Sequence, residues 1–221
     1  FTFPSGKEGN PGEWDYSDEE LFTTRIVETG DPLYIFNAFT DKDHIVGKWV
    51  KGLQLVPGTL PGVAEYQVHL ETFFEEDEEN KFARPIYDYS FRYNFQRRIE
   101  GRKKELPTFD KLVVKARSLS GKAEKFQVAL LDKDGKAFGK LLELGPEEKE
   151  YTIELSELQP VKTVTLPRPY PGFLPYFFEH NIQGDLHIQN VESLQFSIGP
   201  GMTAEEQNQE HAVGISTVRF Q

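Results

Sequence analysis

Apolar and polar residues alternate along most of this chain in short runs that are bounded by Gly, Pro, Asp and Asn. Alternation with a period of two residues is the pattern of β-strands, because successive side chains point to opposite faces. It predicts strands over residues 22–28, 33–38, 48–56, 63–74, 86–99, 111–118, 124–131, 137–144, 150–155, 191–198 and 213–220. The pair Asp134-Gly135 between two of these runs predicts a hairpin. Strands this short and numerous, without a helical stripe, predict an all-β fold, an antiparallel β-sandwich of the jelly-roll type.

Residues 1–20 are rich in Gly, Pro and acidic residues and show no periodicity, so we expect an irregular N-terminal arm. The strand pattern fills residues 21–221 without a repeat or linker, which predicts a single domain. Two segments interrupt the pattern. Residues 75–81 form an acidic run that we expect to be a solvated loop, and residues 166–190 combine four prolines with many aromatic side chains. Long segments of the second kind are often functional, and the aromatic content argues against disorder.

The two faces of the predicted strands carry different residues. In the run 86–99, Phe91 and aromatic neighbours at two-residue spacing share one face, and polar residues share the other. The apolar sets are the expected core. The polar sets are rich in amides, hydroxyls, His and Arg, which supply the donors and acceptors that sugar hydroxyls need. The alternative is an ordinary solvated face. The candidate carbohydrate-binding residues of these faces are Gln67, His69, Arg92, Asn94, Gln96, Gln127 and Gln195.

Aromatic side chains, most of them in the segment 166–190, form a second candidate surface. Their flat apolar rings suit the C–H face of a pyranose. The same rings would also suit a protein interface, or would merely cap the end of the sandwich. The residues of this surface are Trp49, Tyr170, Phe173 and Tyr176, with Arg168 and His180 as polar neighbours.

Composition excludes several classes of function. The chain has 221 residues, with 25 Lys and Arg against 36 Asp and Glu, and a formal net charge of −11. Such a chain is a poor generic binder of nucleic acid, and among sugars its charge favours neutral β-glucans, xylans or mannans over polyuronates. It has no Cys, which excludes disulfides and thiolate metal sites. No apolar run is long enough to span a bilayer, and residues 1–4 show no signal-peptide pattern.

Several short segments share the order and character of the strands of a known family. They are residues 33–49, 109–119, 126–138, 147–158, 191–198 and 213–220. In this order the chain resembles carbohydrate-binding modules of the galactose-binding-domain-like β-sandwich type. The resemblance implies a jelly roll that binds a plant or algal-type polysaccharide without cleaving it. It also implies a secreted or cell-surface location within a larger multimodular protein, where the module targets an associated degradative enzyme.

Modules of this family often hold a structural Ca²⁺ near their first strand. At that place the chain offers Asn37, Asp41 and Asp43 as oxygen ligands, which suit a hard cation. The last strand departs from the family pattern, because Ser216 and Thr217 stand where an acidic residue is common. The implied calcium site therefore rests on the Asp-rich turn, and such turns also form without metal. No other cofactor is expected.

Two other classes of function stay open. A jelly-roll glycoside hydrolase would need two carboxylates about 5–9 Å apart. Glu65 and Glu71 share a strand face but lie about 20 Å apart on it, and the histidine spacing predicts no zinc site. A polysaccharide lyase would use Arg92 and His69. The last class is a protein-interaction domain that uses the segment 166–190 as its anchor.

Overall fold

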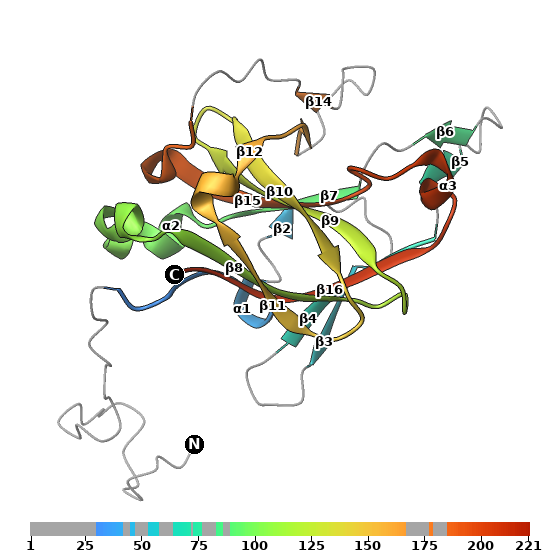
Figure 1. The fold of residues 1–221 in the computed structure, drawn as a ribbon, viewed down its shortest axis with the longest axis horizontal. Helices are drawn as coiled ribbons and strands as arrows, with labels where there is room; N and C mark the ends of the chain where they lie inside the picture. Colours follow the sequence, from blue (N-terminus) through green and yellow to red (C-terminus); the bar gives the residue numbers. More distant parts are fainter. Residues whose placement is uncertain are drawn as a thin grey trace, which may run out of the picture. The chain divides into compact units, whose positions relative to one another are not determined.

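The computed structural model describes residues 30–41, 45–46, 53–57, 64–71, 73–76, 83–85, 89–166, 177–178 and 185–221. Residues Pro32–Gln221 form one compact unit. In this unit two antiparallel sheets pack face to face as a β-sandwich (Figure 1). The prediction of a single-domain, all-β sandwich is thus confirmed. The predicted arm at 1–20 and the predicted strand at 22–28 lie outside the described residues.

The first sheet, sheet A, is built around the last strand of the chain. Its strand order is β11 (Lys149–Glu154), β8 (Lys111–Ser118), β16 (His211–Phe220), β4 (Ala64–Leu70) and β3 (Leu53–Pro57). Strand β1 (Leu33–Asn37) pairs with the second half of β16, beyond the end of β4. All these pairings are antiparallel.

The second sheet, sheet B, lies above sheet A in Figure 1. Its order is β12 (Gln159–Pro160), β10 (Ala137–Leu144), β9 (Glu124–Asp132), β15 (Val191–Ile198), β7 (Tyr89–Asn94) and β2 (Ile45–Val46). The predicted hairpin joins β9 to β10. Asp132 Oδ1 accepts the backbone N–H groups of Asp134 and Lys136 at 2.9 and 2.8 Å, and Gly135 has φ +80°. Consecutive strands such as β8 and β9, or β15 and β16, belong to different sheets, as expected for a jelly roll.

The predicted strand 86–99 ends earlier than the alternation indicates. Asn94 Oδ1 accepts the backbone N–H of Gln96 at 3.0 Å, which starts helix α2 (Gln96–Ile99) and then the 3₁₀ helix η2 (Glu100–Thr108). The other short helices are α1 (Ala38–Asp41), η3 (Leu155–Glu157), η4 (Ile188–Asn190) and α3 (Ala204–Gln207). Two small hairpins pair β5 (Phe74–Glu76) with β6 (Ala83–Pro85), and β13 (Thr163–Val164) with β14 (Phe177–Phe178). The acidic run 75–81 thus begins in a strand, and the segment 166–190 contains one.

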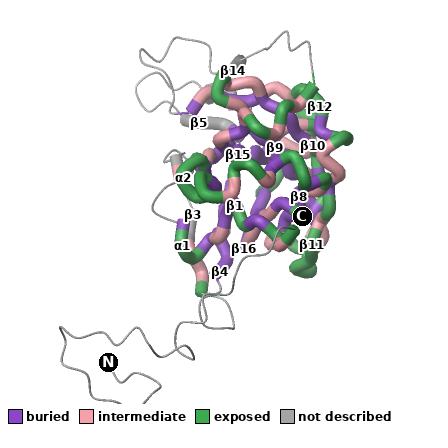
Figure 2. Tube along the Cα trace, turned by 90° about the vertical axis from the view of Figure 1, so that its left-hand side faces the viewer, coloured by how far each residue is buried: buried purple, intermediate pink, exposed green. Residues whose placement is uncertain are grey.

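The core is aromatic, as the strand faces predict. Phe196 of sheet B packs against Phe91 and Phe126 with ring centroids 5.0 and 5.5 Å apart. Phe36 and Tyr66 of sheet A meet the same cluster at 5.6 and 5.9 Å. Figure 2 shows the buried residues along the strands and exposed ones in short helices such as α2. These rings join the two sheets and are unavailable to any ligand, because they are buried.

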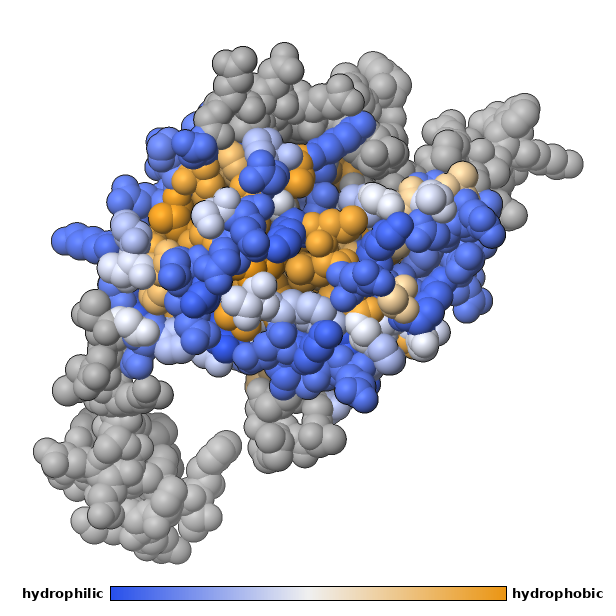
Figure 3. Space-filling model, in the orientation of Figure 1, coloured by the Kyte–Doolittle hydropathy of each residue, from blue (hydrophilic) through white to orange (hydrophobic). Residues whose placement is uncertain are grey.

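The edge of the sandwich between β10 and β11 faces the viewer in Figure 1. In the same orientation, Figure 3 shows apolar side chains that reach the surface there among polar ones. Tyr151 of β11 and Leu155, which follows β11 directly, are partly buried against the core. The candidate polar residues of the two outward sheet faces belong to other parts of the surface.

Candidate functional site

The outward face of sheet B is bonded to a segment of the protein's own chain. Residues 159–166, which we call the covering segment, begin in the edge strand β12 of this sheet and run past β13, whose partner β14 lies above the sheet in Figure 1. Gln195 accepts hydrogen bonds from Arg92 Nε and Nη2 at 3.0 and 2.8 Å, and its amide donates to the Val164 carbonyl at 3.0 Å. Arg92 Nη1 donates to the Leu166 carbonyl at 3.3 Å. Gln195 is fully buried, and burial lowers the pKa of Arg92.

Further polar groups of this face also have partners inside the protein. Gln127 donates to the Lys162 carbonyl at 3.2 Å, and the hydroxyl groups of Ser90 and Ser197 bond to each other at 2.6 Å. All but Lys162 are buried. The polar atoms of these side chains already bond to carbonyls of the covering segment or to each other. A ligand would therefore reach them only by displacing the covering segment.

The remaining candidates of sheet B lie at the end of β7. Asn94 and Gln96 are both exposed, and the amide oxygen of Asn94 serves as the acceptor that starts α2. The aromatic candidate surface and one metal candidate lie outside the described residues: Trp49, Arg168, Tyr170, Phe173, Tyr176, His180 and Asp43.

Gln67 and His69 lie on the opposite side of the sandwich from Gln127 and Gln195. They belong to β4 and point outward from sheet A, since Val68 between them is fully buried in the core. The polar residues that alternation groups together therefore lie on two surfaces. Alternation assigns a side chain to one face of its own strand, whereas strand pairing decides which sheet that face belongs to.

A continuous hydrogen-bonded row crosses the outward face of sheet A. Arg117 of β8 donates to Glu65 of β4 through Nε and Nη2, at 2.7 and 2.8 Å. Gln67 donates to the same carboxylate at 2.8 Å, and the ring of His69 lies 3.5 Å from the Gln67 amide oxygen. Gly214 of β16 lies directly beneath the Glu65 carboxylate, where any Cβ would collide with it. We call Glu65, Gln67, His69 and Arg117 the sheet A polar row.

The carboxyl group of Glu65 is held in its charged form. Burial raises its pKa, but hydrogen bonds from Arg117 and Gln67 and the charge of Arg117 outweigh burial, so the net pKa is lowered. The pKa of Arg117 is raised by the same hydrogen bond. The pKa of Glu150 is lowered as well, first by its hydrogen bond from Arg219. A general acid for glycoside hydrolysis needs a raised pKa, so neither carboxyl group suits that role.

An exposed aromatic ring lies on the same face. Tyr34 of β1 is 45% exposed and stands opposite Arg219 in the register of β1 and β16. The guanidinium carbon of Arg219 lies 5.8 Å from the Tyr34 ring centroid. Glu150 holds that guanidinium with two hydrogen bonds of 2.7 and 2.9 Å. The ring is therefore supported by an ordered charge pair.

Sequence reasoning missed Tyr34 for a specific reason. Regular alternation places Tyr34 and Phe36 on the same face of a strand. A register shift between the two residues turns Phe36 into the core, where it is fully buried, and leaves Tyr34 outside. No residue pattern in this strand reports that shift.

The described part of the predicted calcium site is engaged with an arginine. The Asp41 carboxylate pairs with Arg98, accepts the backbone N–H of Asn37 at 2.7 Å and accepts the Thr40 hydroxyl at 3.2 Å. The Asn37 amide oxygen accepts the N–H of Phe39 at 2.9 Å. In this arrangement Arg98 and backbone N–H groups around the start of α1 already engage these oxygens of Asp41 and Asn37, and Asp43 lies outside the described residues, so the calcium site stays a prediction. Within the described ranges, no cluster of three or more His, Cys, Asp or Glu could hold a metal.

Comparison with known proteins gives likenesses of structure only. No protein-family model matches the sequence, and no curated protein matches it. A family 11 carbohydrate-binding module from Clostridium thermocellum, in complex with a β-1,3-1,4-mixed-linked tetrasaccharide, is 12% identical with a TM-score of 0.48, over 76% of this chain and 81% of that one. An exo-β-agarase is 11% identical with a TM-score of 0.48, over 86% of this chain but 24% of its own. Values this low assign no function. No helix in the described ranges is long and apolar enough to cross a membrane.

Proposed function

We propose that this protein is a non-catalytic carbohydrate-binding module that binds a neutral polysaccharide through the outward face of sheet A. The observation that carries the proposal is the sheet A polar row on the same face as the exposed ring of Tyr34. Bound to a polymer in this way, the module would keep an associated degradative enzyme close to its substrate.

The chemistry of the face suits sugar hydroxyls. A hydroxyl group both donates and accepts, and the row offers guanidinium and amide donors beside carboxylate and amide acceptors. The exposed half of the Tyr34 ring offers a flat apolar surface for the C–H face of a sugar. The register partners of Gln67 and Tyr34 on β16 are Gly214 and Arg219, roughly 15 Å apart along the strand, so a polymer and not a single sugar ring would span both features.

The charges of this face support a neutral ligand. Arg117 pairs with Glu65, Arg219 pairs with Glu150, and Lys115 pairs with Glu148 at 3.0 Å. An acidic sugar would have to compete with these carboxylates for the cations. The pairs also hold long side chains in place, which reduces the entropy lost on binding.

Affinity electrophoresis against soluble β-glucan, xylan, mannan and polygalacturonate tests the proposal, with reducing-end release measured in parallel. We expect at least one neutral polymer to retard the protein without release of sugar. Two variants are tested separately, the double variant Gln67→Ala/His69→Ala and the single variant Tyr34→Ala. Each is expected to weaken binding at least about tenfold, which corresponds to about 1.4 kcal/mol.

Glu143→Ala is the matched control, because Glu143 is an exposed residue of β10 on the other sheet. It is expected to bind as the wild type does. Unchanged binding in both sheet A variants would refute the location of the site. Release of sugar would show an enzyme instead, and no retardation by any polymer would refute carbohydrate binding and leave a protein-interaction domain.

A further inference from the structure

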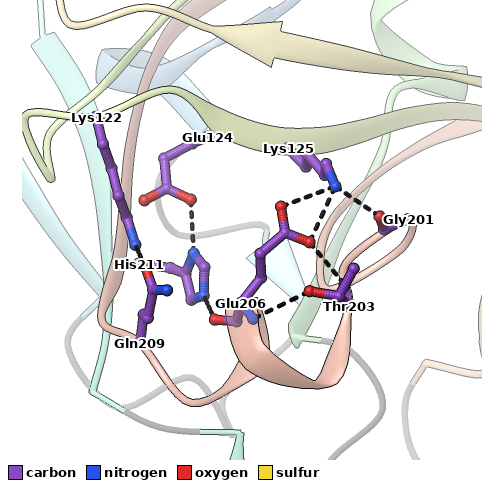
Figure 4. Close-up of polar contacts among 8 residues, drawn as sticks. All are labelled: Lys122, Glu124, Lys125, Gly201, Thr203, Glu206, Gln209 and His211. Carbon is purple, nitrogen blue, oxygen red and sulfur yellow. Dashed lines mark hydrogen bonds and ion pairs between the residues drawn. The ribbon is translucent and has the colours of Figure 1, made fainter.

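A buried histidine and a buried glutamate meet at one end of the sandwich, on the core side of sheet A. His211 is the first residue of β16 and Glu124 the first of β9, and they are 3% and 1% exposed. His211 Nδ1 lies 2.6 Å from Glu124 Oε2, and Nε2 lies 2.8 Å from the backbone oxygen of Glu206 (Figure 4). The ring of Phe73 packs edge-on against the imidazole at 5.4 Å between centroids. Both ring nitrogens are therefore at hydrogen-bond distance from an oxygen in a site closed to solvent.

These two distances fix the number of protons in the site. A neutral imidazole carries one N–H, so it can donate to only one of the two oxygens. If the Glu124 carboxylate is charged, the ring nitrogen of His211 that carries no hydrogen faces an oxygen at 2.6 or 2.8 Å, with a lone pair on both atoms. Buried acceptors without a donor are costly, because no water replaces the missing bond. Both contacts are satisfied only when the pair carries one more proton.

We propose that Glu124 and His211 share this extra proton, either as carboxylate and imidazolium or as carboxylic acid and neutral imidazole. The proton allows both hydrogen bonds to form in a pH-sensitive contact, which consists of Glu124, His211 and the backbone oxygen of Glu206. Loss of the proton at alkaline pH removes one of the two bonds. The weaker bond is the one to Glu206 O, and its loss removes one of the contacts that hold residues 203–209, while those of Lys125 with Glu206 and of Lys122 with Gln209 remain.

The groups around Glu124 leave His211 as its ionisable partner. Ser120 Oγ lies 2.6 Å from Glu124 Oε1, so the hydroxyl donates there. Ser118 Oγ lies 3.1 Å from Ser120 Oγ and continues the chain of hydroxyls. The nearby Lys122 points elsewhere, because its Nζ donates to Gln209 at 2.6 Å (Figure 4).

The carboxylate of Glu206 on α3 is also engaged with other partners. The Glu206 carboxylate lies 2.8 Å from Lys125 Nζ and accepts the backbone N–H of Thr203 at 2.6 Å. The Lys125 and Thr203 contacts lower the pKa of Glu206 to about 2. Its charge is therefore constant over the range in which a histidine titrates. Glu210, the neighbour of His211 in sequence, is exposed.

The sign of the pH dependence follows from the proton count. In the proposed pair the folded protein holds one proton more than a charged carboxylate and a neutral imidazole hold together. Folding therefore takes up a proton at neutral to alkaline pH, and stability falls as the pH rises. One proton corresponds to a change of about tenfold per pH unit in the folding equilibrium constant.

Glu124→Gln is the sharpest variant, because it keeps the bonds and removes the titration. Its amide nitrogen donates to Nδ1, neutral His211 donates through Nε2 to Glu206 O, and Ser120 still donates to the amide oxygen. Urea unfolding of both proteins from about pH 5 to about pH 9 measures the difference. We expect the midpoint of the wild type to fall relative to that of the variant as the pH rises.

The ¹⁵N shifts of the His211 ring in the wild-type protein give an independent reading that needs no variant. At about pH 6 we expect Nε2 to be protonated and Nδ1 to be protonated or to accept from Glu124. A neutral ring with its proton on Nδ1, beside a charged carboxylate, would overturn the proposal. Unfolding midpoints that stay parallel for the wild type and Glu124→Gln over the whole pH range would overturn it as well.

Discussion

A single glycine makes room for the salt bridge at the centre of the sheet A polar row. The carboxylate of Glu65 lies across Gly214, and a Cβ at that position would overlap it. Gly214→Ala should therefore push Glu65 away from Arg117 and reduce the free energy of unfolding by about 1–3 kcal/mol. Urea unfolding measures the loss, and sugar binding should weaken with it.

The matched control is Gly101→Ala. Gly101 lies in η2, and a Cβ there meets nothing within 4 Å. This variant should be as stable as the wild type or slightly more stable, because alanine reduces the freedom of the unfolded chain. Equal effects of the two substitutions would show that the contact with Glu65 is not what makes Gly214 necessary.

The pair of Glu65 and Arg117 predicts a loss of stability on acidification. The lowered pKa of Glu65 means that the pair stabilises the fold above the ordinary carboxyl range and that this contribution disappears as the pH falls through the folded pKa. Arg117→Gln should cost about 1–2 kcal/mol at neutral pH, discounted because Arg117 is partly exposed. The difference from the wild type should shrink below about pH 4, as measured by urea unfolding.

A surface pair gives the comparison for this experiment. Lys140 and Glu157 lie 2.6 Å apart, and the Glu157 side chain is 50% exposed, whereas that of Glu65 is 10% exposed. Lys140→Gln should change stability much less than Arg117→Gln, because solvent screens exposed pairs. A difference between wild type and Arg117→Gln that persists at low pH would mean that the arginine acts through packing and not through its charge.

At the scale of the elements, the sequence predicts strands far better than it predicts their ends and partners. Alternation locates β8, β10 and β15 at their observed bounds, since each has a strong apolar set. The range 63–74 contains β4 and reaches only the first residue of β5. The range 86–99 ends in a helix, because local hydrogen bonds such as that of Asn94 overrule the pattern. Alternation cannot report which strands pair, so it could not separate Gln67 from Gln195.

Gln195 contributes more to holding the covering segment against sheet B than any exposed residue does. Its fully buried side chain joins the partly buried Arg92 of β7 to the Val164 carbonyl. Gln195→Ala should cost about 1–3 kcal/mol, because it leaves these groups without partners. Hydrogen exchange should then increase in residues 159–166 more than in the strands of sheet A.

Gln67→Ala is the control, because Gln67 is only partly buried and makes no contact with the covering segment. Its exchange in 159–166 should match that of the wild type. If Gln195→Ala leaves both exchange and stability unchanged, the hydrogen bonds to the covering segment contribute nothing. If it instead abolishes sugar binding while stability is unchanged, the ligand site lies on sheet B.

The ion pair of Asp41 and Arg98 predicts that calcium is dispensable for the fold. The guanidinium and the backbone N–H of Asn37 already occupy the carboxylate. Thermal unfolding in calcium chloride should therefore have the same midpoint as in magnesium chloride at equal ionic strength, and EDTA should not lower it. A stabilisation specific to calcium would show instead that the ion displaces Arg98, with Asp43 as the natural additional ligand.

At the scale of the whole molecule, the aromatic content mainly serves the core in the part of the chain that the structure describes. The chain is 13% aromatic, and the large rings whose burial the structure describes are mostly inside. Tyr34 and Phe39 are the aromatic residues with large exposure in that part of the chain. Composition alone indicates neither fact, because it says nothing of position. Strand alternation predicts the core residues. The exposure of Tyr34 follows only from the register of β1 and β16.

The contrast between a net charge of −11 and a charge-paired binding face predicts how salt affects binding. In the proposed function, neutral sugars would interact with the face through short hydrogen bonds and ring contacts, which salt does not screen. An anionic polymer would instead be repelled by the chain as a whole, and this repulsion weakens as the Debye length falls from about 10 Å at 0.1 M to about 3 Å at 1 M. The dissociation constant for the neutral polymer should therefore change less than about twofold over that range, as calorimetry can measure. A steep loss of affinity with salt would show that unpaired cations on another surface bind the ligand.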